Sequence, residues 1–341
     1  MPDFFFDRII NFGDDIASFS LKISKIAKQK GGNLDGISQE DIKGGNAINT
    51  AFALAALEAK VIPIVCINDE GIKKINSDIK QCNIDLSHLK KIKNPSITSA
   101  LEFKVKNKKV NIMLRDLGSL ANFQSSHLNM KDYEIIEDAD YVCLFNWAGT
   151  RKYGTQLAQD IFLRVKTNGR GKTYYDTADP NSNAKNISDL VNKALTEDFI
   201  DILSLNENEA ISYASFFDRK IKEKNETVDS EVSLNAARIL AKKVNARIDL
   251  HTSKFSATIT KKKEFCVRTF KIKPKKVTGA GDAWNAGNII ADMNSLSDTS
   301  RLILANAVSA CYLADSKNMY PTKETLIEFI QKEYSNSLLF A

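Results

Sequence analysis

The sequence predicts an α/β fold, in which a mainly parallel β-sheet is flanked by helices and carries a small additional β-sheet. Short apolar runs alternate with helical patterns along most of the 341 residues, and this alternation is typical of parallel sheets. Two segments, at about 16–42 and 97–115, break the alternation and indicate the additional sheet. We therefore expect a single domain over residues 1–341, with these two segments as insertions.

The apolar runs are expected to form the strands of the main sheet. In chain order they are residues 9–12, 61–67, 141–145, 173–175, 202–205 and 248–250. Helices are expected from Asn46 onwards, with Ile48 and Phe52 on one face, and over residues 71–81, 188–195 and 233–244. Because ligands of parallel sheets collect at the carboxyl ends of the strands, we expect the functional site at that edge.

The additional sheet is predicted most clearly by a hairpin pattern. Residues 99–105 and 109–114 alternate between apolar and polar side chains around a polar turn at Asn107 and Lys108. Residues 16–42 alternate more loosely. A small sheet beside a substrate site works as a lid that excludes water, and it also serves as a dimer contact; the two roles are compatible.

The composition is typical of a globular cytoplasmic protein, with 43% hydrophobic and 26% charged residues. Residues 51–67 are the most apolar run, and Glu58, Lys60 and Pro63 interrupt it, so no membrane association is expected. Five cysteines without a C-x-x-C spacing indicate a reducing compartment. The net charge of +6 comes from lysine clusters near predicted turns, which favours solvated loops over nucleic-acid binding.

The most informative motif is the run Thr278, Gly279, Ala280, Gly281 and Asp282, where a loop enters a helix. Its small residues allow backbone N–H groups to approach an anion, and the helix N-terminus contributes a favourable partial charge. A carboxylate beside such an anion site is explained by general-base catalysis, in which Asp282 takes a proton from a hydroxyl during phosphoryl transfer. The alternative is that the glycines only terminate and start helices.

A second motif precedes the helix that begins near Asn46. Gly44 and Gly45 allow close approach of a ligand, and Asn46 and Asn49 lie about one turn apart on the helix. Amide side chains at this spacing donate and accept hydrogen bonds with a polyol. An asparagine-capped helix is the alternative interpretation.

A third candidate follows the expected strand 202–205. Asn206 and Glu209 stand at the carboxyl end of this strand, where an amide and a carboxylate are placed to hold magnesium through water. The alternative is again a capped helix start.

These motifs occur in one order along the chain: Gly-Gly-Asn-x-x-Asn, then Asn-Ile-Asp at residues 83–85, then Asn206-x-x-Glu209, then Gly-Ala-Gly-Asp. In order and approximate spacing they resemble the ribokinase family of small-molecule kinases, the phosphofructokinase-B-type group, over residues 9–330. The resemblance implies a Rossmann-like α/β body with a β-sheet lid, ATP as phosphoryl donor and Mg²⁺.

The resemblance also implies roles for individual residues. Asp282 corresponds to the base, Gly279, Ala280 and Gly281 to the anion hole, and Thr278 to a nucleotide contact beside it. Asn206 and Glu209 correspond to the magnesium and phosphate element, with Glu209 acting through water. Gly44, Gly45, Asn46 and Asn49 correspond to the acceptor-binding helix.

Further positions resemble the family less closely. Arg115 is similar to an arginine that follows the lid hairpin in some sugar-acid and fructose kinases, although Asp116 beside it is an alternative partner. Asp176 resembles the family's aspartate at a strand end. Thr252 and Ser253 lie where the family has a nucleotide loop, but the Gly-x-x-Gly sequence of that loop is absent.

Two departures from the family bear on the acceptor and on potassium. The position expected to hold the sugar-binding aspartate is Ser18, whereas the acids lie earlier, at Asp14 and Asp15; Asp14 is our candidate for the acceptor contact. Lys276 replaces an aspartate that helps to hold potassium in potassium-activated relatives, so no K⁺ requirement is expected.

We therefore predict an ATP- and Mg²⁺-dependent kinase of a small sugar or sugar acid, forming a homodimer through the β-lid. A nucleoside kinase is the alternative, because Phe103, Phe123 and Trp147 are candidates to stack on a base, although packing in the core or lid is the favoured explanation of these residues. A non-catalytic sugar or nucleotide sensor on the same fold, and a nucleic-acid-binding protein, are the other hypotheses. The acceptor and the choice of ATP or ADP as donor remain open at this point.

Overall fold

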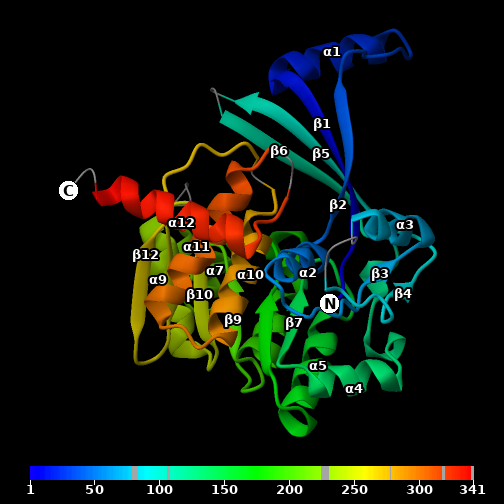
Figure 1. The fold of residues 1–341 in the computed structure, drawn as a ribbon. Helices are drawn as coiled ribbons and strands as arrows, with labels where there is room; N and C mark the ends of the chain where they lie inside the picture. Colours follow the sequence, from blue (N-terminus) through cyan, green and yellow to red (C-terminus); the bar gives the residue numbers. More distant parts are fainter. Residues whose placement is uncertain (79–82, 106–107, 224–229, 277, 317–318, 339–341) are drawn as a thin grey trace.

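The structure is a computed structural model that describes residues 1–78, 83–105, 108–223, 230–276, 278–316 and 319–338 (Figure 1). Within these residues the strands form a six-stranded sheet, a four-stranded sheet and a two-stranded pair. Helices cover the six-stranded sheet, and the four-stranded sheet projects from it at the top of the view in Figure 1. This arrangement confirms the predicted α/β fold.

The six-stranded sheet is parallel except at one edge. Its strand order is β12-β11-β10-β9-β8-β7; β7 to β10 run parallel, and β11 and β12 pair antiparallel. The strands are β7 (Tyr141–Phe145), β8 (Lys172–Asp176), β9 (Ile202–Leu205), β10 (Arg247–His251), β11 (Phe255–Ile259) and β12 (Glu264–Arg268). The predicted strands 141–145 and 202–205 match β7 and β9 at both ends; β9 is buried at every residue, and such strands are continuous apolar runs.

Helices pack on both faces of this sheet. Leu203 and Leu205 of β9 belong to one apolar cluster with side chains of α5, α7 and α9, whereas Ile202 belongs to another that includes Ile289 of α10. The helices of the body are α2 (Asn46–Ala56), α3 (Asp69–Asp78), α4 (Met130–Asp138), α5 (Gly154–Asn168), α6 (Ile187–Leu190), α7 (Glu207–Phe217), α8 (Lys220–Glu223), α9 (Ser230–Lys243), α10 (Ala280–Met293), α11 (Asp298–Ala314) and α12 (Lys323–Leu338). The shorter turns are the 3-10 segments η1 (Gly118–Asn122), η2 (Ser125–His127) and η3 (Pro180–Asn186), and the π-helical turn η4 (Val191–Leu195).

The predicted strand 61–67 is mostly wrong. Only β3 (Cys66–Ile67) forms, and it pairs with β4 (Lys90–Lys91), while Val61 makes one isolated bridge to Ile84. Pro63 has no N–H to donate, which disfavours a continuous ladder through this segment.

The four-stranded sheet has the order β2-β1-β5-β6 and consists of β1 (Phe5–Asp15), β2 (Ser38–Gly44), β5 (Ser96–Val105) and β6 (Lys108–Asp116). The predicted hairpin is present as β5 and β6, although Asn107 of its turn lies outside the described residues. Across this sheet, Asp7 pairs with Thr98 and Thr98 pairs with Arg115. Because residues paired directly across neighbouring strands point to the same face, these three side chains share one face of the sheet.

Residues 16–42 do not form strand throughout, which corrects the expectation for this segment. The first part is the helix α1 (Ile16–Lys28), and Asp15 caps it by accepting from the N–H of Ser18 at 2.8 Å. Phe19 of this helix packs against Phe12 and Phe103 of the sheet. Isoleucine or phenylalanine recurs every three or four residues from Ile16 to Ile26, and this helical period outweighs the loose alternation.

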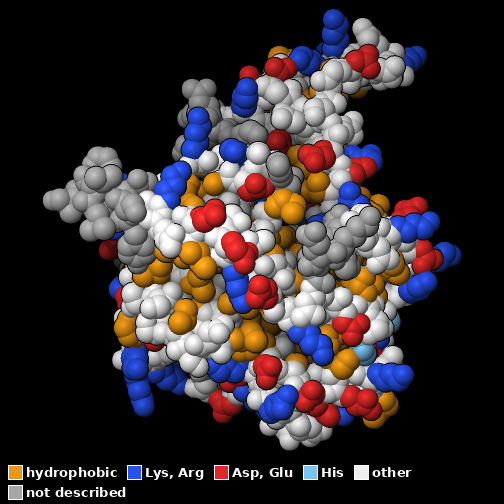
Figure 2. All heavy atoms as spheres, viewed as in Figure 1, with side chains coloured by type: hydrophobic (Ala, Val, Ile, Leu, Met, Phe, Trp, Pro, Cys, Tyr) orange, Lys and Arg blue, Asp and Glu red, His pale blue; other side chains and the backbone are white. Residues whose placement is uncertain are grey.

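The surface carries charges of both signs. On the face shown in Figure 2, basic and acidic side chains are interspersed, with apolar side chains between them. Among the described residues, every helix is too short or too polar to cross a lipid bilayer. Cys66, Cys143, Cys266 and Cys311 are free thiols, and Cys82 lies outside the described part of the chain.

Candidate active site

The loop that contains Gly279 enters α10 as predicted. Gly279 has a left-handed backbone with φ 80°, and α10 begins at the next residue. A Cβ atom on Gly279 would lie 2.8 Å from the Tyr312 hydroxyl, so both the backbone and the space require glycine. At Gly281 a Cβ atom would lie 3.3 Å from the His251 ring. The helix N-terminus thus presents its N–H groups from a loop packed between two ring side chains.

Asp282 lies in the first turn of α10 and contacts the second predicted motif. The Asn49 Nδ2 atom on α2 donates to the Asp282 Oδ2 atom at 2.9 Å. The Thr50 hydroxyl of the same helix donates to the Asp282 carbonyl at 3.4 Å. The fold therefore brings together two motifs that lie 233 residues apart in the sequence.

Burial raises the pKa of Asp282 well above its ordinary value. Hydrogen bonds from Asn49 and Asn46 lower this pKa, whereas the nearby carboxylates of Asp176 and Asp3 raise it. Only 6% of the residue is exposed. A carboxylate with a raised pKa binds a proton more strongly, and this is the property that a general base requires.

Asp3 is a buried residue of this region that the sequence analysis missed. Its carboxylate accepts from the backbone N–H groups of Asn46 and Ala47, at 2.9 and 2.8 Å, and so caps α2 from outside the helix. The Asn146 Nδ2 atom donates to the same carboxylate at 2.8 Å. Asp3 also leaves no space for a side chain at position 45, because a Cβ atom on Gly45 would lie 2.9 Å from the Asp3 carbonyl oxygen. In the sequence, Asp3 precedes three phenylalanines, and this local pattern does not predict that Asp3 caps α2.

Asn206 and Glu209 form a reciprocal cap at the start of α7. The Asn206 side chain accepts from the Glu209 N–H at 3.0 Å, and the Glu209 carboxylate accepts from the Asn206 N–H at 2.9 Å. The Asn206 Nδ2 atom donates to the other carboxylate oxygen at 2.8 Å. Burial, followed by the charge of Asp176, raises the pKa of Glu209 well above its usual value. The capped helix start is therefore observed, and it places a buried carboxylate next to Asp176.

Asn285 connects this strand edge to α10 and was also missed by the sequence analysis. Its Oδ1 atom accepts from the hydroxyls of Tyr174 on β8 and Ser204 on β9, each at 2.7 Å. Its Nδ2 atom donates to Asp176 at 2.6 Å. Because Asn285 lies one turn after Asp282, these bonds fix the rotation of the helix that carries Asp282.

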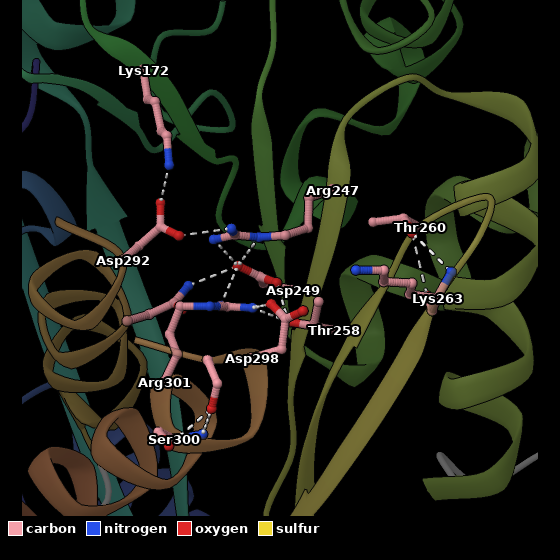
Figure 3. A network of polar contacts seen from close by, with 12 residues as sticks. Lys172, Arg247, Asp249, Thr258, Thr260, Lys263, Asp292, Asp298, Ser300 and Arg301 are labelled. Atoms are coloured by element: carbon pink, nitrogen blue, oxygen red, sulfur yellow. Dashed lines mark hydrogen bonds and ion pairs between the residues drawn. The ribbon is translucent and has the colours of Figure 1, made fainter. Parts of the chain in front are cut away.

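A charged network fixes the other end of α10 (Figure 3). Asp292 of α10 pairs with Arg247 of β10 at 2.9 Å and with Lys172 at 2.8 Å. Arg247 and Arg301 of α11 both pair with the buried Asp249, at 2.9 and 3.0 Å. The polar face of α10 is thus anchored to the sheet along its length.

Thr252 and Ser253 lie in the tight turn between β10 and β11. The Thr252 hydroxyl donates to the Phe255 carbonyl at 2.7 Å, and the Ser253 N–H donates to Glu207 at 3.1 Å. His251, which precedes the turn, lies against Gly281. The start of the turn therefore lies near Gly281 of α10, and a nucleotide contact by Thr252 and Ser253 stays a prediction. Burial lowers the pKa of His251 to about 4, so this histidine is neutral at pH 7.

Asp7 and Arg115 share one face of the four-stranded sheet, and Asp7, rather than Asp14, lies beside the motif that begins at Gly44. Asp14 is half-buried at the far end of β1, where it pairs with Lys22, and the structure does not bring it to the other candidates. Asp7 lies instead beside Gly44, where a Cβ atom would collide with the Asp7 carboxylate at 1.8 Å. Burial raises the pKa of Asp7 to about 6, and its buried Oδ1 atom has no hydrogen-bond partner.

Comparison with known proteins identifies the family. The pfkB family carbohydrate kinase model matches residues 12–325. The chain belongs to the pfkB family of carbohydrate kinases. It is 26% identical over 305 residues to a ribokinase from Haemophilus influenzae. The aligned residues cover 88% of this chain and 91% of that protein. This pfkB-family protein is a small-molecule kinase, and the predicted resemblance is confirmed.

Solved structures share the fold of this pfkB kinase. An adenosine kinase from Sinorhizobium meliloti superposes with a TM-score of 0.72 at 14% identity, covering 96% of each chain. A putative ribokinase II from Escherichia coli, in complex with ATP and Mg²⁺, superposes with a TM-score of 0.67 at 14% identity, covering 96% of this chain and 98% of that chain. At these identities the likeness establishes the fold alone.

The kinase site fits a nucleotide phosphate and a loosely held divalent cation. The α10 N-terminus offers backbone N–H groups at a glycine-containing loop, which suits a phosphoryl group. The charge of Asp176 raises the pKa of Glu209, and a cation beside the two carboxylates would relieve that repulsion. Among the described residues, no cluster of three acidic, histidine or cysteine side chains is close enough to cage a metal. Mg²⁺ typically binds through few carboxylates, retained waters and substrate phosphates, which agrees with this geometry.

Lys276 of the kinase packs on an aromatic stack beside Gly279. Its Nζ atom lies 3.5 Å from the centroid of the Tyr312 ring, and that ring stacks on Tyr320 at 4.6 Å. Burial lowers the pKa of Lys276 to about 8. The ammonium group therefore lies over the Tyr312 ring, which packs beside Gly279.

Proposed function

We propose that this protein transfers a phosphoryl group from ATP to a hydroxyl of a small sugar or sugar acid, with Asp282 as general base. The observation that carries the proposal is the buried Asp282 carboxylate, held by Asn49 at the N-terminus of α10. When bound, ATP would supply the phosphoryl group, and Mg²⁺ would neutralise its charge.

Each group of side chains has one task in this proposal. Asp282 accepts the proton of the acceptor hydroxyl, and the N–H groups of Gly279, Ala280 and Gly281 stabilise the negative charge on the transferred group. Gly44, Asn46 and Asn49 bind the acceptor, together with Asp7. Thr252, Ser253 and Thr278 border the nucleotide. The four-stranded sheet serves as the lid that excludes water from the reaction.

The three aromatic residues that favoured a nucleoside acceptor, Phe103, Phe123 and Trp147, are packed inside the protein. Phe103 stacks with Phe12 inside the small sheet, Phe123 packs against His127, and the Trp147 indole donates to Thr155 in the core. All three rings are buried, so they offer no free face to a base. A sugar-type acceptor is therefore the better supported class.

The test is a turnover assay with a panel of sugars, sugar acids, sugar phosphates, polyols and nucleosides, with ATP or ADP as donor. We expect Mg²⁺-dependent conversion of ATP to ADP with at least one sugar-type acceptor. Turnover with nucleosides alone would support the nucleoside kinase instead. Binding of acceptors without any turnover would support the non-catalytic sensor.

Asn206→Ala or Glu209→Ala is expected to raise the Mg²⁺ concentration required for half-maximal turnover more than the KM for the acceptor. Each change also removes a helix cap, which costs about 1 kcal/mol in the free energy of unfolding. Asn129→Ala is the matched control, because Asn129 and Asp132 form the same reciprocal cap on α4, away from the site. An unchanged Mg²⁺ curve with a raised acceptor KM would assign Asn206 and Glu209 to the acceptor.

Replacing Na⁺ by K⁺ at equal ionic strength is expected to change turnover by less than about twofold. The Lys276 ammonium already places a fixed positive charge next to the loop, and a second cation there would be repelled. Lys276→Asp is expected to lower turnover without K⁺ and to gain partial activation by K⁺. Strong K⁺ activation of the unmodified protein would contradict this prediction.

We also propose that two copies associate through the small sheet. Ile97, Ile112 and Leu114 of β5 and β6 are exposed apolar side chains, of the kind that an interface buries. Light scattering after size exclusion measures the mass in solution, and a monomer at micromolar concentration would contradict the proposal.

A further inference from the structure

An apolar hollow lies at the edge of the six-stranded sheet, beside β7. Its volume is about 540 Å³, and it is bordered by β7 on one side and by residues 61–65 on the other. Ala47 of α2 and Ile289 of α10 line one face, and Ile136 and Ala139 at the end of α4 line the opposite face. Two backbone segments and two helical layers therefore enclose the hollow, which is the environment of a buried strand.

Met1 and Pro2 lie at one end of this hollow and pair with both of its sides (Figure 1). The Met1 nitrogen donates to the Cys143 carbonyl at 3.0 Å, and the Phe145 N–H donates to the Met1 carbonyl at 2.7 Å. These two bonds form one rung of a parallel ladder, in which one residue bonds to the residues before and after its partner. On the other side, the Cys66 N–H donates to the Pro2 carbonyl at 2.8 Å. Met1 and Pro2 therefore connect β7 to β3 as a short piece of strand.

The backbone on each side of the hollow is placed like the edge of a sheet. Among the described residues, β7 is the edge strand of its sheet and pairs with β8 on its other side. On the opposite side of the hollow, Val61 and Val65 direct their backbone bonds away from it, towards residues 83–90. Backbone groups alternate in direction along an extended chain, so those of Ile62 and Ile64 face the hollow. Buried backbone groups require hydrogen-bond partners, and an added strand would supply them on both sides.

We propose that this hollow is a strand site, and that its occupant is an extended apolar segment that runs directly into Met1. Because Met1 pairs in parallel with β7, the positions ahead of Met1 lie alongside Cys143, Val142 and Tyr141, which line the hollow. Both faces of the hollow are apolar, so the occupant is expected to be an uninterrupted apolar run of about four residues. This inference does not depend on the kinase activity.

The proposal also accounts for the strand that was predicted over residues 61–67. This run has the apolar sequence of a buried strand, yet β3 forms only at its end, at the level where Pro2 lies beside it. Pro63 belongs to the alternate positions that point away from the hollow, so its missing N–H does not interrupt pairing on the hollow side. A small apolar ligand would fill the volume but would leave both backbone edges without partners.

The test extends the full chain by five residues placed directly before Met1. The apolar extension Lys-Val-Ile-Val-Val is compared with Lys-Val-Pro-Val-Pro, which lacks N–H donors at its prolines, and with the polar extension Lys-Ser-Asp-Ser-Asp. We expect the apolar extension to raise Tm by about 5 °C or more, and each of the other two to change it by less than about 2 °C. Hydrogen exchange of the Cys143 and Ile64 amides is expected to slow by about tenfold or more with the apolar extension alone.

A pair of substitutions locates the added segment. Ala139→Phe places a ring in the hollow and is expected to abolish the gain in Tm that the apolar extension gives. Ala17→Phe, at an exposed position of α1, is the matched control and is expected to leave that gain unchanged. The gain is measured within each background, so an effect of either substitution on the unextended protein cancels.

The outcomes separate this inference from the alternatives and from the proposed function. Equal Tm values for the apolar and polar extensions would overturn the proposal, as would a gain in Tm that Ala139→Phe leaves intact. A free peptide, acetyl-Lys-Val-Ile-Val-Val-amide, is titrated against the unextended protein. If the free peptide raises Tm and the joined segment does not, the occupant is a separate chain and the proposal of a joined segment is wrong. None of these measurements requires turnover, so they decide independently of the kinase assignment.

Discussion

Asp282→Asn is expected to lower kcat by about a hundredfold or more, because an amide cannot accept the proton of the acceptor hydroxyl. The change conserves the volume of a side chain that is only 6% exposed. The new amide oxygen retains the hydrogen bond from Asn49, so the fold and ATP binding are expected to persist. The measurement is kcat at saturating acceptor, together with an ATP binding isotherm for each protein.

The pH dependence of the unmodified protein provides a second measurement of the same base. Burial raises the pKa of Asp282, so the acid limb of the rate profile is expected at a higher pH than an ordinary aspartate, near 4, would give. Asp189→Asn, which alters a surface pair with Lys193, is the control for removal of one carboxylate. Near-normal turnover of Asp282→Asn would remove Asp282 from the role of base.

Arg301→Met is expected to lower the free energy of unfolding by about 3 kcal/mol, because it leaves part of a buried charge uncompensated. Arg301 is buried and donates to Asp249 at 3.0 Å, to Thr258 at 2.6 Å and to Asp298 at 2.9 Å (Figure 3). Methionine fills much of the volume but supplies none of these donors. Arg247 still pairs with Asp249, so the expected loss lies at the lower end of the range for buried pairs.

Arg238→Met is the matched control for that measurement. Arg238 pairs with Glu264 through two hydrogen bonds, at 2.8 and 2.6 Å, but the pair is largely exposed. Its removal is expected to cost at most about 1 kcal/mol. Urea unfolding of both variants gives the comparison, and equal losses would show that the network around Asp249 contributes no more than a surface pair.

The body of the fold was predictable because its strands are local features of the sequence. β7 and β9 match the predicted residues at both ends, since each is an uninterrupted apolar run, and β9 is buried on both faces. The errors occur where a local pattern was ambiguous. Residues 16–28 fit a helical period better than an alternating one, and Pro63 interrupts the strand predicted over residues 61–67.

The site was predictable where its residues form motifs, and only there. Gly279 and Asp282 are three residues apart in the sequence, and Gly45 and Asn46 are adjacent, so each pair leaves a local pattern. Asp3, Asp7 and Asn285 leave none. Asp14 was chosen by its position after Gly13 in the sequence, and Asp7 was not considered, whereas β1 begins at Phe5 and continues past that glycine.

The sequence by itself determined the α/β class, the helix starts at Asn46 and Ala280, and the order of the motifs that identify the family. Only the tertiary structure showed that Asn49 donates a hydrogen bond to the buried carboxylate of Asp282 and that Asp7 lies beside Gly44. It also showed that β7 and residues 61–65 border the same hollow. The physical reason is the range of the interactions. Backbone propensity and apolar period act over a few residues. The proton affinity and the partners of a charged side chain depend on atoms that the fold brings from distant parts of the chain.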